Sequence, residues 1–269
     1  MKTIVISQGF ISTYLIKILK ELGHQVTVFH HDDKIVIKEA DYIFYTSSYG
    51  NHYHQKDQAT IFKSNVYDYL KLLRDTKDIP YKCLFYFSSS SVTLPVQTDY
   101  SDAKFIGEIL SRRFVKKFKK PIICIRPASV WGIGEAPWRL MPTAINNVLD
   151  GKDMPITVGY HDWIYVEDFV DGLIKVMENA HKVIGKSIPI GTAKQTSNHE
   201  ILGMIMKITK KAVKLVESDA VKRKFDTKNW ISNNEIIRSF GWKQKYTVEQ
   251  GLQKMIDNYV ANRLKKTSH

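Results

Sequence analysis

The chain has 269 residues with 43% hydrophobic content, enough to bury a large core as one elaborated domain or as a nucleotide-binding domain with a smaller lobe. No apolar run approaches the length of a membrane span, and the chain starts with a strand-like run rather than a signal peptide, so we expect a cytoplasmic protein without a membrane partner. The net charge of +13 is spread along helical stretches, which favours solvated helix faces and an anionic small-molecule ligand over a nucleic-acid partner.

Apolar strands alternate with amphipathic helices through the first half of the chain. We predict strands at 2–7, 25–30, 41–46, 83–88 and 121–126, and helices at 10–22, 58–75 and 100–117. Strands that are apolar throughout are typical of a parallel sheet covered by helices on both faces. The predicted fold class is therefore α/β, with a doubly wound parallel sheet.

The pattern changes after Gly132. We predict a helix at 139–150, strands near 154–158 and 163–166, and a helix at about 168–178. Capping boxes at 197–200 and 247–250 predict two more helices, and the last residues, from about 262, are expected to fray. We therefore predict a sheet domain at 1–133 and a smaller C-terminal α/β lobe at 134–269, with segments around 160–192 returning to the sheet.

Tyr100 and Lys104 are the most informative pair of residues. Four positions apart on a predicted helix, their side chains share one face. A nearby ammonium stabilises phenolate, so the tyrosine could exchange a proton with a substrate oxygen. The run Ser88–Ser91, at the end of a predicted strand, offers a hydroxyl to the same oxygen. Such a set suits hydride transfer to or from a carbinol carbon, provided that a nicotinamide lies alongside.

The turn at 7–12 leads into a helix N-terminus, where backbone amides can meet a pyrophosphate. With the Tyr-x-x-x-Lys pair, this turn resembles that of the extended short-chain dehydrogenases/reductases, the NAD-dependent sugar-nucleotide epimerase/dehydratase family. That family spaces three glycines three apart, and the matching positions here are Ile6, Gly9 and Ser12. Ser12 is a mild change, whereas Ile6 is expected to be the more serious departure, because a β-branched residue cannot take the positive φ that glycine permits.

The resemblance implies a Rossmann-type dinucleotide-binding domain at 1–133, which binds NADP or NAD, and a substrate-binding lobe at 134–269. The cofactor-binding residues that it implies are Gly9, Phe10, Ile11, His30, His31, Thr46, Ser47, Asn65, Lys104 and Pro127. At position 30 a histidine replaces the family's acidic residue, and His30, His31 or Lys34 could pair with a 2′-phosphate, which favours NADP over NAD. Asp32 or Asp33 could still reach the ribose. The spacing of the histidines at 30, 31, 52 and 54 supports no metal site.

Later segments follow the family in order. Residues 126–132 are similar to Arg-Pro-Gly-Asn-Val-Tyr-Gly, 161–168 to Arg-Asp-Phe-Ile-His-Val-x-Asp, 223–226 to Arg-Pro-Gly-Asp and 240–243 to Leu-Gly-Trp-x. The resemblance implies catalytic Ser89, Tyr100 and Lys104, and substrate contacts at Ser90, Ser129, His161 and Arg223. Counting from the other end of the serine run would favour Ser90 over Ser89 as the catalytic hydroxyl. Trp131, Trp163 and Trp242 are expected in the core, and Asp168 is expected to be a cap or an anchor.

The activity that the resemblance implies is NAD(P)-dependent reduction or epimerisation of a nucleotide-linked sugar. Ser90 and Ser91 stand where dehydratases carry an Asp-Glu pair, so we do not expect a 4,6-dehydratase. A homodimer formed through the helix of Tyr100 is expected, with Phe105, Ile109 and Phe114 either at its interface or in the core. The alternatives are a non-catalytic NAD(P)-binding sensor, suggested by the missing glycines, and a basic nucleic-acid-binding protein.

Overall fold

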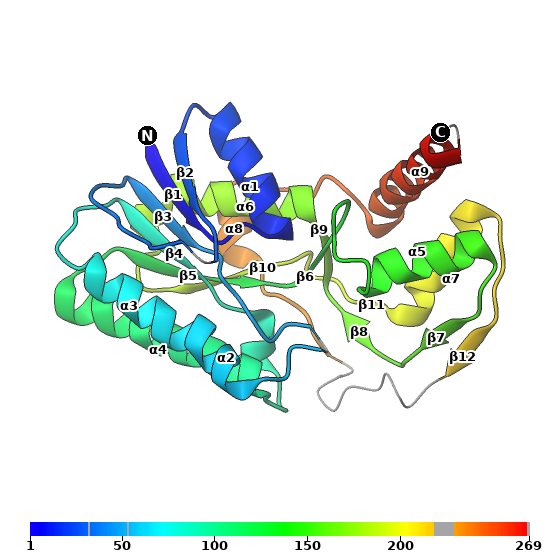
Figure 1. Cartoon of the computed structure of the whole chain (residues 1–269), viewed down its shortest axis with the longest axis horizontal. Coiled ribbons are helices and arrows are strands. Elements are labelled where there is room, and N and C mark those ends of the chain that lie inside the picture. The colour runs from blue at the N-terminus through cyan, green and yellow to red at the C-terminus, as the bar shows by residue number, and fades with distance from the viewer. Residues whose placement is uncertain (32, 53, 218–228, 268–269) are drawn as a thin grey trace. The chain divides into compact units, whose positions relative to one another are not determined.

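A computed structural model describes residues 1–31, 33–52, 54–217 and 229–267 (Figure 1). Its largest sheet has six parallel strands in the order β10-β5-β4-β3-β1-β2. The strands are β1 Lys2–Ile6, β2 Gln25–Phe29, β3 Tyr42–Tyr45, β4 Cys83–Phe87, β5 Ile122–Pro127 and β10 Ser187–Ile190. From β1 the chain first adds β2 on one side and then crosses to β3 on the other. The doubly wound prediction is thus confirmed, and the switch point between β1 and β3 is where such sheets bind ligands.

Helices cover both faces of this sheet. They are α1 Phe10–Glu21, α2 Gln58–Phe62, α3 Asp68–Asp75, α4 Asp99–Phe118, α6 Val166–Glu178 and α8 Glu235–Ser239. Two short 3₁₀ helices lie at Ser90–Thr93 and Ala180–Lys182. Figure 1 shows α3 and α4 on one face and α1 and α6 on the other. Because both faces are covered, every residue of β4 is buried.

The helix predicted at 58–75 is interrupted by a π-helix at Lys63–Tyr67 between α2 and α3. Buried side chains hydrogen-bond to carbonyl groups in this segment and in α2 just before it. The Tyr45 hydroxyl donates to the Ser64 carbonyl at 2.7 Å, and Asn65 Nδ2 donates to the Ile61 carbonyl at 2.8 Å. The Tyr86 hydroxyl donates to the Asn65 carbonyl at 3.3 Å. These donors stabilise a wide turn that helix periodicity alone does not predict.

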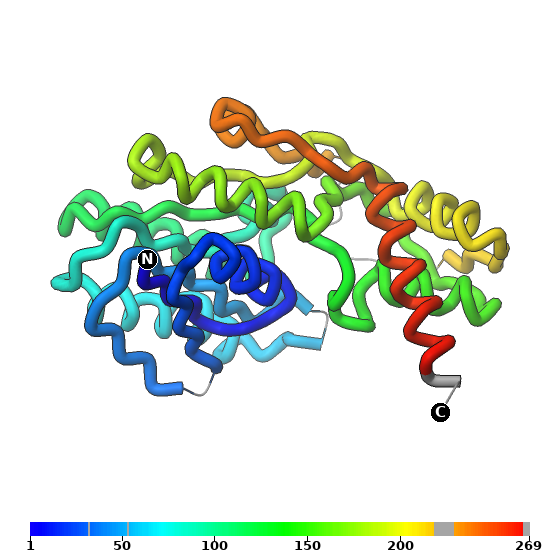
Figure 2. The backbone as a smooth tube through the Cα atoms, turned by 90° about the horizontal axis from the view of Figure 1, so that it is seen from above, coloured from blue at the N-terminus to red at the C-terminus, as the bar shows by residue number. Residues whose placement is uncertain are grey.

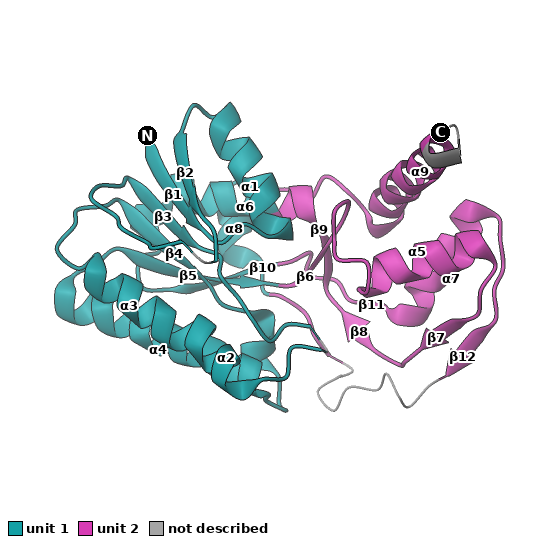
Figure 3. Cartoon of the chain, in the orientation of Figure 1, with its two compact units in different colours: residues 1–127, 170–190, 233–242 teal, residues 128–169, 191–232, 243–269 magenta. Residues whose placement is uncertain are grey.

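The chain divides into two compact units, coloured in Figure 3. Unit 1 comprises residues 1–127, 170–190 and 233–242, and contains the six-stranded sheet. Unit 2 comprises residues 128–169, 191–232 and 243–269. The sequence predicts a domain boundary after residue 133, whereas the first segment of unit 1 ends at residue 127. It also predicts a return to the sheet near 160–192, and unit 1 resumes at 170–190. The second return, at 233–242, brings Trp242 into unit 1, where it is buried beside Gly172 as a core residue.

The described part of unit 2 is built from short strand pairs and three helices. Its elements are β6 Ser129–Trp131, β7 Met154–Ile156, β8 Tyr160–His161, β9 Trp163–Tyr165, β11 Thr196–Ser197, β12 Leu215–Glu217, α5 Leu140–Asp150, α7 Asn198–Thr209 and α9 Val248–Thr267. The pairs β6–β9 and β7–β12 are parallel, and β8–β11 is antiparallel. Trp131 and Trp163 lie in the apolar core of this unit, as predicted.

Local signals in unit 2 behaved as expected, with one exception. The predicted capping box of α7 forms, with the Glu200 amide donating to Ser197 Oγ at 3.1 Å and the Ser197 amide to Glu200 Oε2 at 2.7 Å. Asp168 is an anchor, because its carboxylate accepts the amides of Lys245 and Tyr246 at 2.8 and 3.0 Å. The frayed end predicted from about residue 262 is wrong, since α9 continues to Thr267 as one helix (Figure 2).

Within the described residues, no helix combines the length and the apolar character that crossing a bilayer requires.

Candidate active site

The turn after β1 adopts its left-handed conformation at Ser7 and not at Ile6. Ile6 pairs with Phe29 of β2 and Tyr45 of β3 as an ordinary buried strand residue. Ser7 has φ 74°, and the Thr46 hydroxyl donates to its carbonyl at 2.6 Å. The expectation that Ile6 would be a serious defect of the turn is therefore wrong, because the strand extends through this position and the positive φ falls one residue later.

Gly9 is the N-cap of α1, and Ser12 closes the turn around it. The Gly9 amide donates to Ser12 Oγ at 2.6 Å, and the Thr13 hydroxyl donates to the Gly9 carbonyl at 2.8 Å. A Cβ atom added at Gly9 would meet nothing within 4 Å, so the space over the turn is open. The first-turn amides of a helix, here including those of Phe10 and Ile11, have no acceptor within their own helix. This helix end can therefore receive an anion.

The end of β2 carries the groups that bear on the choice between NAD and NADP, namely two histidines and a carboxylate. Asp33 turns back on the strand, and its Oδ2 accepts the His30 amide at 2.6 Å. His30 and His31 are exposed, while Asp32 lies outside the described residues. Across the residues that the structure describes, no group of three or more His, Cys, Asp or Glu side chains could hold a metal ion.

The segment after β3 connects the turn to α4. Thr46 Oγ1 donates to the Ile6 carbonyl at 2.8 Å, and the Ser47 carbonyl accepts Lys104 Nζ at 3.3 Å. Asn65 Nδ2 donates to the Tyr49 carbonyl at 2.7 Å, while its buried Oδ1 has no hydrogen-bond partner. Two predicted cofactor residues, Thr46 and Ser47, therefore follow β3 at the carboxyl edge of the sheet, and Asn65 is bonded to the same segment.

Gly50, which the sequence reading did not single out, packs against the predicted catalytic tyrosine. Its φ is +103°, and a Cβ atom there would lie 2.8 Å from Ile61 Cγ1 and 3.3 Å from Tyr100 Cδ2. Only glycine permits both this backbone conformation and the close approach. A glycine in a loop directly after a buried strand was the available signal.

Tyr100 and Lys104 lie on the first two turns of α4, as predicted. The helix is capped by Thr98, whose hydroxyl accepts the Ser101 amide at 3.2 Å. Tyr100 is half-buried, and its ring centroid is 5.8 Å from Lys104 Nζ. Lys104 is 1% exposed and donates to the Phe87 carbonyl at 2.8 Å. Burial lowers the pKa of this lysine from 10.5 to about 7.

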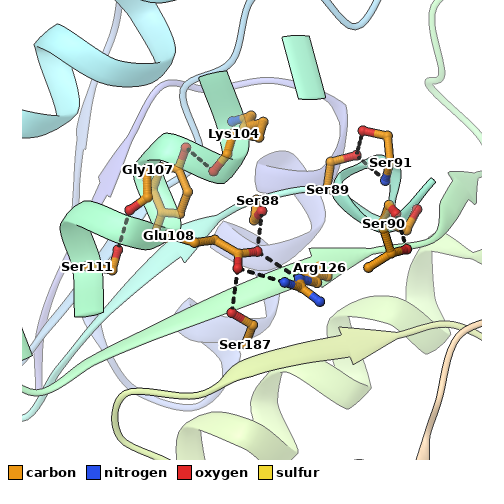
Figure 4. A network of polar contacts seen from close by, with 12 residues as sticks. Ser88, Ser89, Ser90, Ser91, Lys104, Gly107, Glu108, Ser111, Arg126 and Ser187 are labelled. Carbon is orange, nitrogen blue, oxygen red and sulfur yellow. Dashed lines mark hydrogen bonds and ion pairs between the residues drawn. The ribbon is translucent and has the colours of Figure 1, made fainter. Parts of the chain in front are cut away.

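The serine run after β4 has two distinct roles (Figure 4). Ser88 is buried, and its hydroxyl donates to Glu108 Oε1 at 2.7 Å. Ser89 caps the 3₁₀ helix Ser90–Thr93, and its Oγ lies 2.8 Å from Ser91 Oγ and accepts the Ser91 amide at 3.1 Å. Ser89, Ser90 and Ser91 are half-buried, so these three hydroxyls lie nearer to solvent than that of Ser88.

The remaining predicted site residues lie in other segments. Pro127 ends β5 in unit 1 and is half-buried. In unit 2, Ser129 opens β6, and its amide donates to the Asp162 carbonyl at 2.9 Å. His161 is 3% exposed, with its ring centroid 4.9 Å from those of Trp163 and Trp230. Arg223 lies outside the described residues.

The family profile that matches this chain is described as the NAD dependent epimerase/dehydratase family, and the match spans residues 7–191. The chain belongs to this family. The resemblance inferred from the turn, the serine run and the Tyr-x-x-x-Lys pair is thereby confirmed.

Several known proteins are similar to this chain in sequence or in structure. The dTDP-glucose 4,6-dehydratase of Salmonella typhimurium is 29% identical over 192 residues, which cover 64% of this chain and 53% of that protein. The chain thus spans about half the length of the curated relatives it matches. An epimerase from Methanothermobacter thermautotrophicus superposes with a TM-score of 0.85 at 20% identity, covering 99% of this chain and 94% of that one. UDP-glucuronic acid 4-epimerase of Bacillus cereus, solved with UDP-glucuronic acid and NAD, has a TM-score of 0.83 at 20% identity and covers 96% and 98%. These likenesses at 20% identity establish the fold alone.

The family name implies NAD, and the residues of unit 1 fit a dinucleotide. An open helix N-terminus at Gly9 suits the pyrophosphate. Asp33 at the end of β2 can accept ribose hydroxyls, and Lys104 and Tyr100 come together where β3 and β4 end. The two missing glycines do not oppose this fit, because Ile6 stays in the strand and Ser12 hydrogen-bonds within the turn.

Proposed function

We propose that this protein is an NAD(P)-dependent reductase or epimerase of a nucleotide-linked sugar, with Ser89, Tyr100 and Lys104 as its catalytic residues. The observation that carries the proposal is the burial of Lys104 beside Tyr100, with its ammonium bonded to the Phe87 carbonyl at the end of β4. A buried lysine with few partners is costly to fold and is usually retained for a function. Membership in the family and the open turn at Gly9 support the same conclusion.

The three residues divide the work at the substrate oxygen. Tyr100 exchanges a proton with this oxygen, and Lys104 stabilises the phenolate and holds the cofactor ribose. Ser89 donates a hydrogen bond to the same oxygen, since its own Oγ already accepts the Ser91 amide. When bound, the nicotinamide supplies the hydride acceptor or donor.

Residues from several segments are proposed to hold the cofactor. The pyrophosphate is proposed to bind at Gly9, Phe10 and Ile11, and Thr46, Ser47, Asn65 and Pro127 to line the nicotinamide end. His30 and His31 favour NADP at the other end, whereas the Asp33 carboxylate favours NAD, because it would repel a 2′-phosphate. The Bacillus cereus epimerase was solved with NAD. We propose that the cofactor is NAD or NADP, and titration of the protein with NADH and with NADPH distinguishes the two.

The reaction is proposed to be ketosugar reduction or epimerisation rather than dehydration, although dTDP-glucose 4,6-dehydratases are among the relatives that match in sequence. Eliminating water needs an acid and a base beside the catalytic hydroxyl, and Ser90 and Ser91 supply no carboxyl group. Ser90, Ser129, His161 and Arg223 remain the proposed substrate contacts. His161 is enclosed by Trp163 and Trp230, so it would act through its ring edge or after these indoles move.

A homodimer through α4 is proposed from the apolar residues that this helix exposes. Phe105 and Ile109, one turn apart, are 42% and 46% exposed. Phe114 belongs to the core of unit 1 and is left out of this surface. Sedimentation of Ile109→Lys beside the wild type tests the dimer, since a buried lysine at the interface would leave only monomer.

Turnover by Tyr100→Phe tests the proposed chemistry. Loss of a general acid–base group should lower kcat by about 10²- to 10⁴-fold, while NADH affinity stays within a few-fold of the wild type. Tyr67→Phe is the matched control, because Tyr67 is 65% exposed and lies outside the proposed site. Full activity of Tyr100→Phe would refute the catalytic role. Binding of a dinucleotide without turnover of any nucleotide sugar by the wild type would favour the sensor instead.

A further inference from the structure

A buried ion pair is hydrogen-bonded to the first serine of the run, Ser88 (Figure 4). Glu108, on α4, is fully buried and binds Arg126 of β5 through two contacts, Arg126 Nε to Oε1 at 2.7 Å and Arg126 Nη2 to Oε2 at 2.8 Å. Each carboxylate oxygen also accepts one serine hydroxyl at 2.7 Å, Oε1 from Ser88 and Oε2 from Ser187. Arg112 Nη1 approaches Oε2 at 3.4 Å.

These contacts keep Glu108 charged. Burial by itself would raise the pKa of the carboxyl, but the hydrogen bonds from Arg126, Ser88 and Ser187 bring it below its ordinary value. The hydrogen bond to Glu108 raises the pKa of Arg126 in turn. A bidentate pair with both oxygens further satisfied has a defined geometry, so it fixes the groups bound to it.

Two consecutive residues at the end of β4 are hydrogen-bonded to side chains on two consecutive turns of α4. Lys104 holds the Phe87 carbonyl, and Glu108, one turn later, holds the Ser88 hydroxyl. Ser89 is the next residue along the chain, and Tyr100 is one turn before Lys104 on the same helix face. The strand end is therefore bonded to the helix at two successive levels, immediately beside the proposed catalytic hydroxyl.

We propose that Glu108, held by Arg126, is a positioning residue that sets Ser89 against Tyr100 through its hydrogen bond to Ser88. The inference rests on the proposed function, and it assigns to Ser88 and Glu108 a role in turnover without contact with substrate or cofactor. A shift of about 1 Å in a reacting group can lower a rate about 10²-fold, so a single bond at this position matters.

The network contains its own control. Ser88 and Ser187 donate hydrogen bonds of equal length to the two oxygens of one carboxylate, and their partner is fully buried. Ser187 is the first residue of β10 and pairs with Cys124, within the sheet. Ser88 instead immediately precedes Ser89. Removing either hydroxyl should lower the stability of the protein by a similar amount, whereas only the hydrogen bond of Ser88 should affect the position of Ser89.

The experiment compares Ser88→Ala with Ser187→Ala in the full chain. We expect similar decreases in Tm, a kcat of Ser88→Ala about 10- to 100-fold below that of Ser187→Ala, and unchanged KM and NADH affinity in both. Amide hydrogen exchange across 89–94, measured without substrate, should rise in Ser88→Ala only. Ser88→Thr, which restores a hydroxyl, should recover part of kcat.

Two outcomes would overturn the inference while the wild type is active. One is equal kcat in the two alanine variants, which would make the network merely structural. The other is unchanged hydrogen exchange across 89–94 in Ser88→Ala. Failure of the wild type to turn over any nucleotide sugar would instead refute the proposed function, and with it the role in turnover assigned here.

Discussion

Replacing Lys104 by methionine should change how the stability of the protein depends on pH. Lys104 is 1% exposed, and its ammonium has two carbonyl partners, of Phe87 and Ser47, at 2.8 and 3.3 Å. Burial lowers its pKa from 10.5 to about 7. At 1.36 kcal/mol per pH unit, holding this lysine charged at neutral pH costs the fold at most about 5 kcal/mol. Methionine has similar length and no charge.

The direction of the pH effect follows from the depressed pKa. Between pH 7 and about 10 the unfolded chain binds a proton at this lysine that the folded chain releases, so its contribution to stability rises with pH. The unfolding free energy of the wild type, minus that of Lys104→Met, should therefore rise by about 2 kcal/mol between pH 7 and pH 9.

Urea unfolding of both proteins from pH 6 to pH 9 measures this difference, and groups that titrate in both proteins cancel. Lys116→Met, which removes an exposed charge from the same helix, controls for the change in net charge. A difference that stays constant from pH 7 to pH 9 would mean that the buried ammonium keeps its proton throughout. Burial would then not lower the pKa of Lys104 into the range tested.

Two further predictions concern other buried positions. A Cβ atom at Gly107 would overlap the hydroxyl of buried Tyr86, so Gly107→Ala should lower the unfolding free energy, measured in urea, by about 1–3 kcal/mol. Gly203 lies in open space on α7, so Gly203→Ala should leave the unfolding free energy unchanged or raise it. Equal effects of the two substitutions would contradict this packing of Gly107 against Tyr86. Burial raises the pKa of Glu135 to about 7, so its stabilising contribution, present at low pH, is lost as the pH rises through 7. The unfolding free energy of the wild type minus that of Glu135→Gln should fall by about 2 kcal/mol from pH 5 to pH 8, and a flat difference would refute this.

Much of unit 1 was predictable because its signals are local. Apolar strands and amphipathic helices alternate over short stretches, so the parallel sheet followed from periodicity. Tyr100 and Lys104 were placed on one face of α4 by their spacing alone, and their centroid-to-Nζ distance of 5.8 Å agrees.

Features that depend on tertiary contacts were missed. The π-helix at 63–67 is stabilised by side chains of β3 and β4, such as Tyr45 and Tyr86, which no local pattern connects to it. The position of the left-handed residue, Ser7, depends on the register of β1 with its neighbours.

Glu108 was also missed, although a signal existed. A carboxylate four residues after Lys104, on the helix face already assigned to the site, is a buried charge that requires a partner. The sequence alone could not identify that partner as Arg126, because strand β5 meets α4 only in the folded protein.

Titration of the wild type and Lys104→Met with NADH and with NADPH, followed by nicotinamide fluorescence, tests the central claim most directly. We predict saturable binding of at least one dinucleotide to the wild type. The affinity of Lys104→Met should be at least about 10-fold weaker, because the proposed contact of Lys104 with the cofactor ribose would then contribute about 1.4 kcal/mol or more to the binding free energy. Absence of binding of either dinucleotide to the wild type, or equal binding to both proteins, would contradict the account.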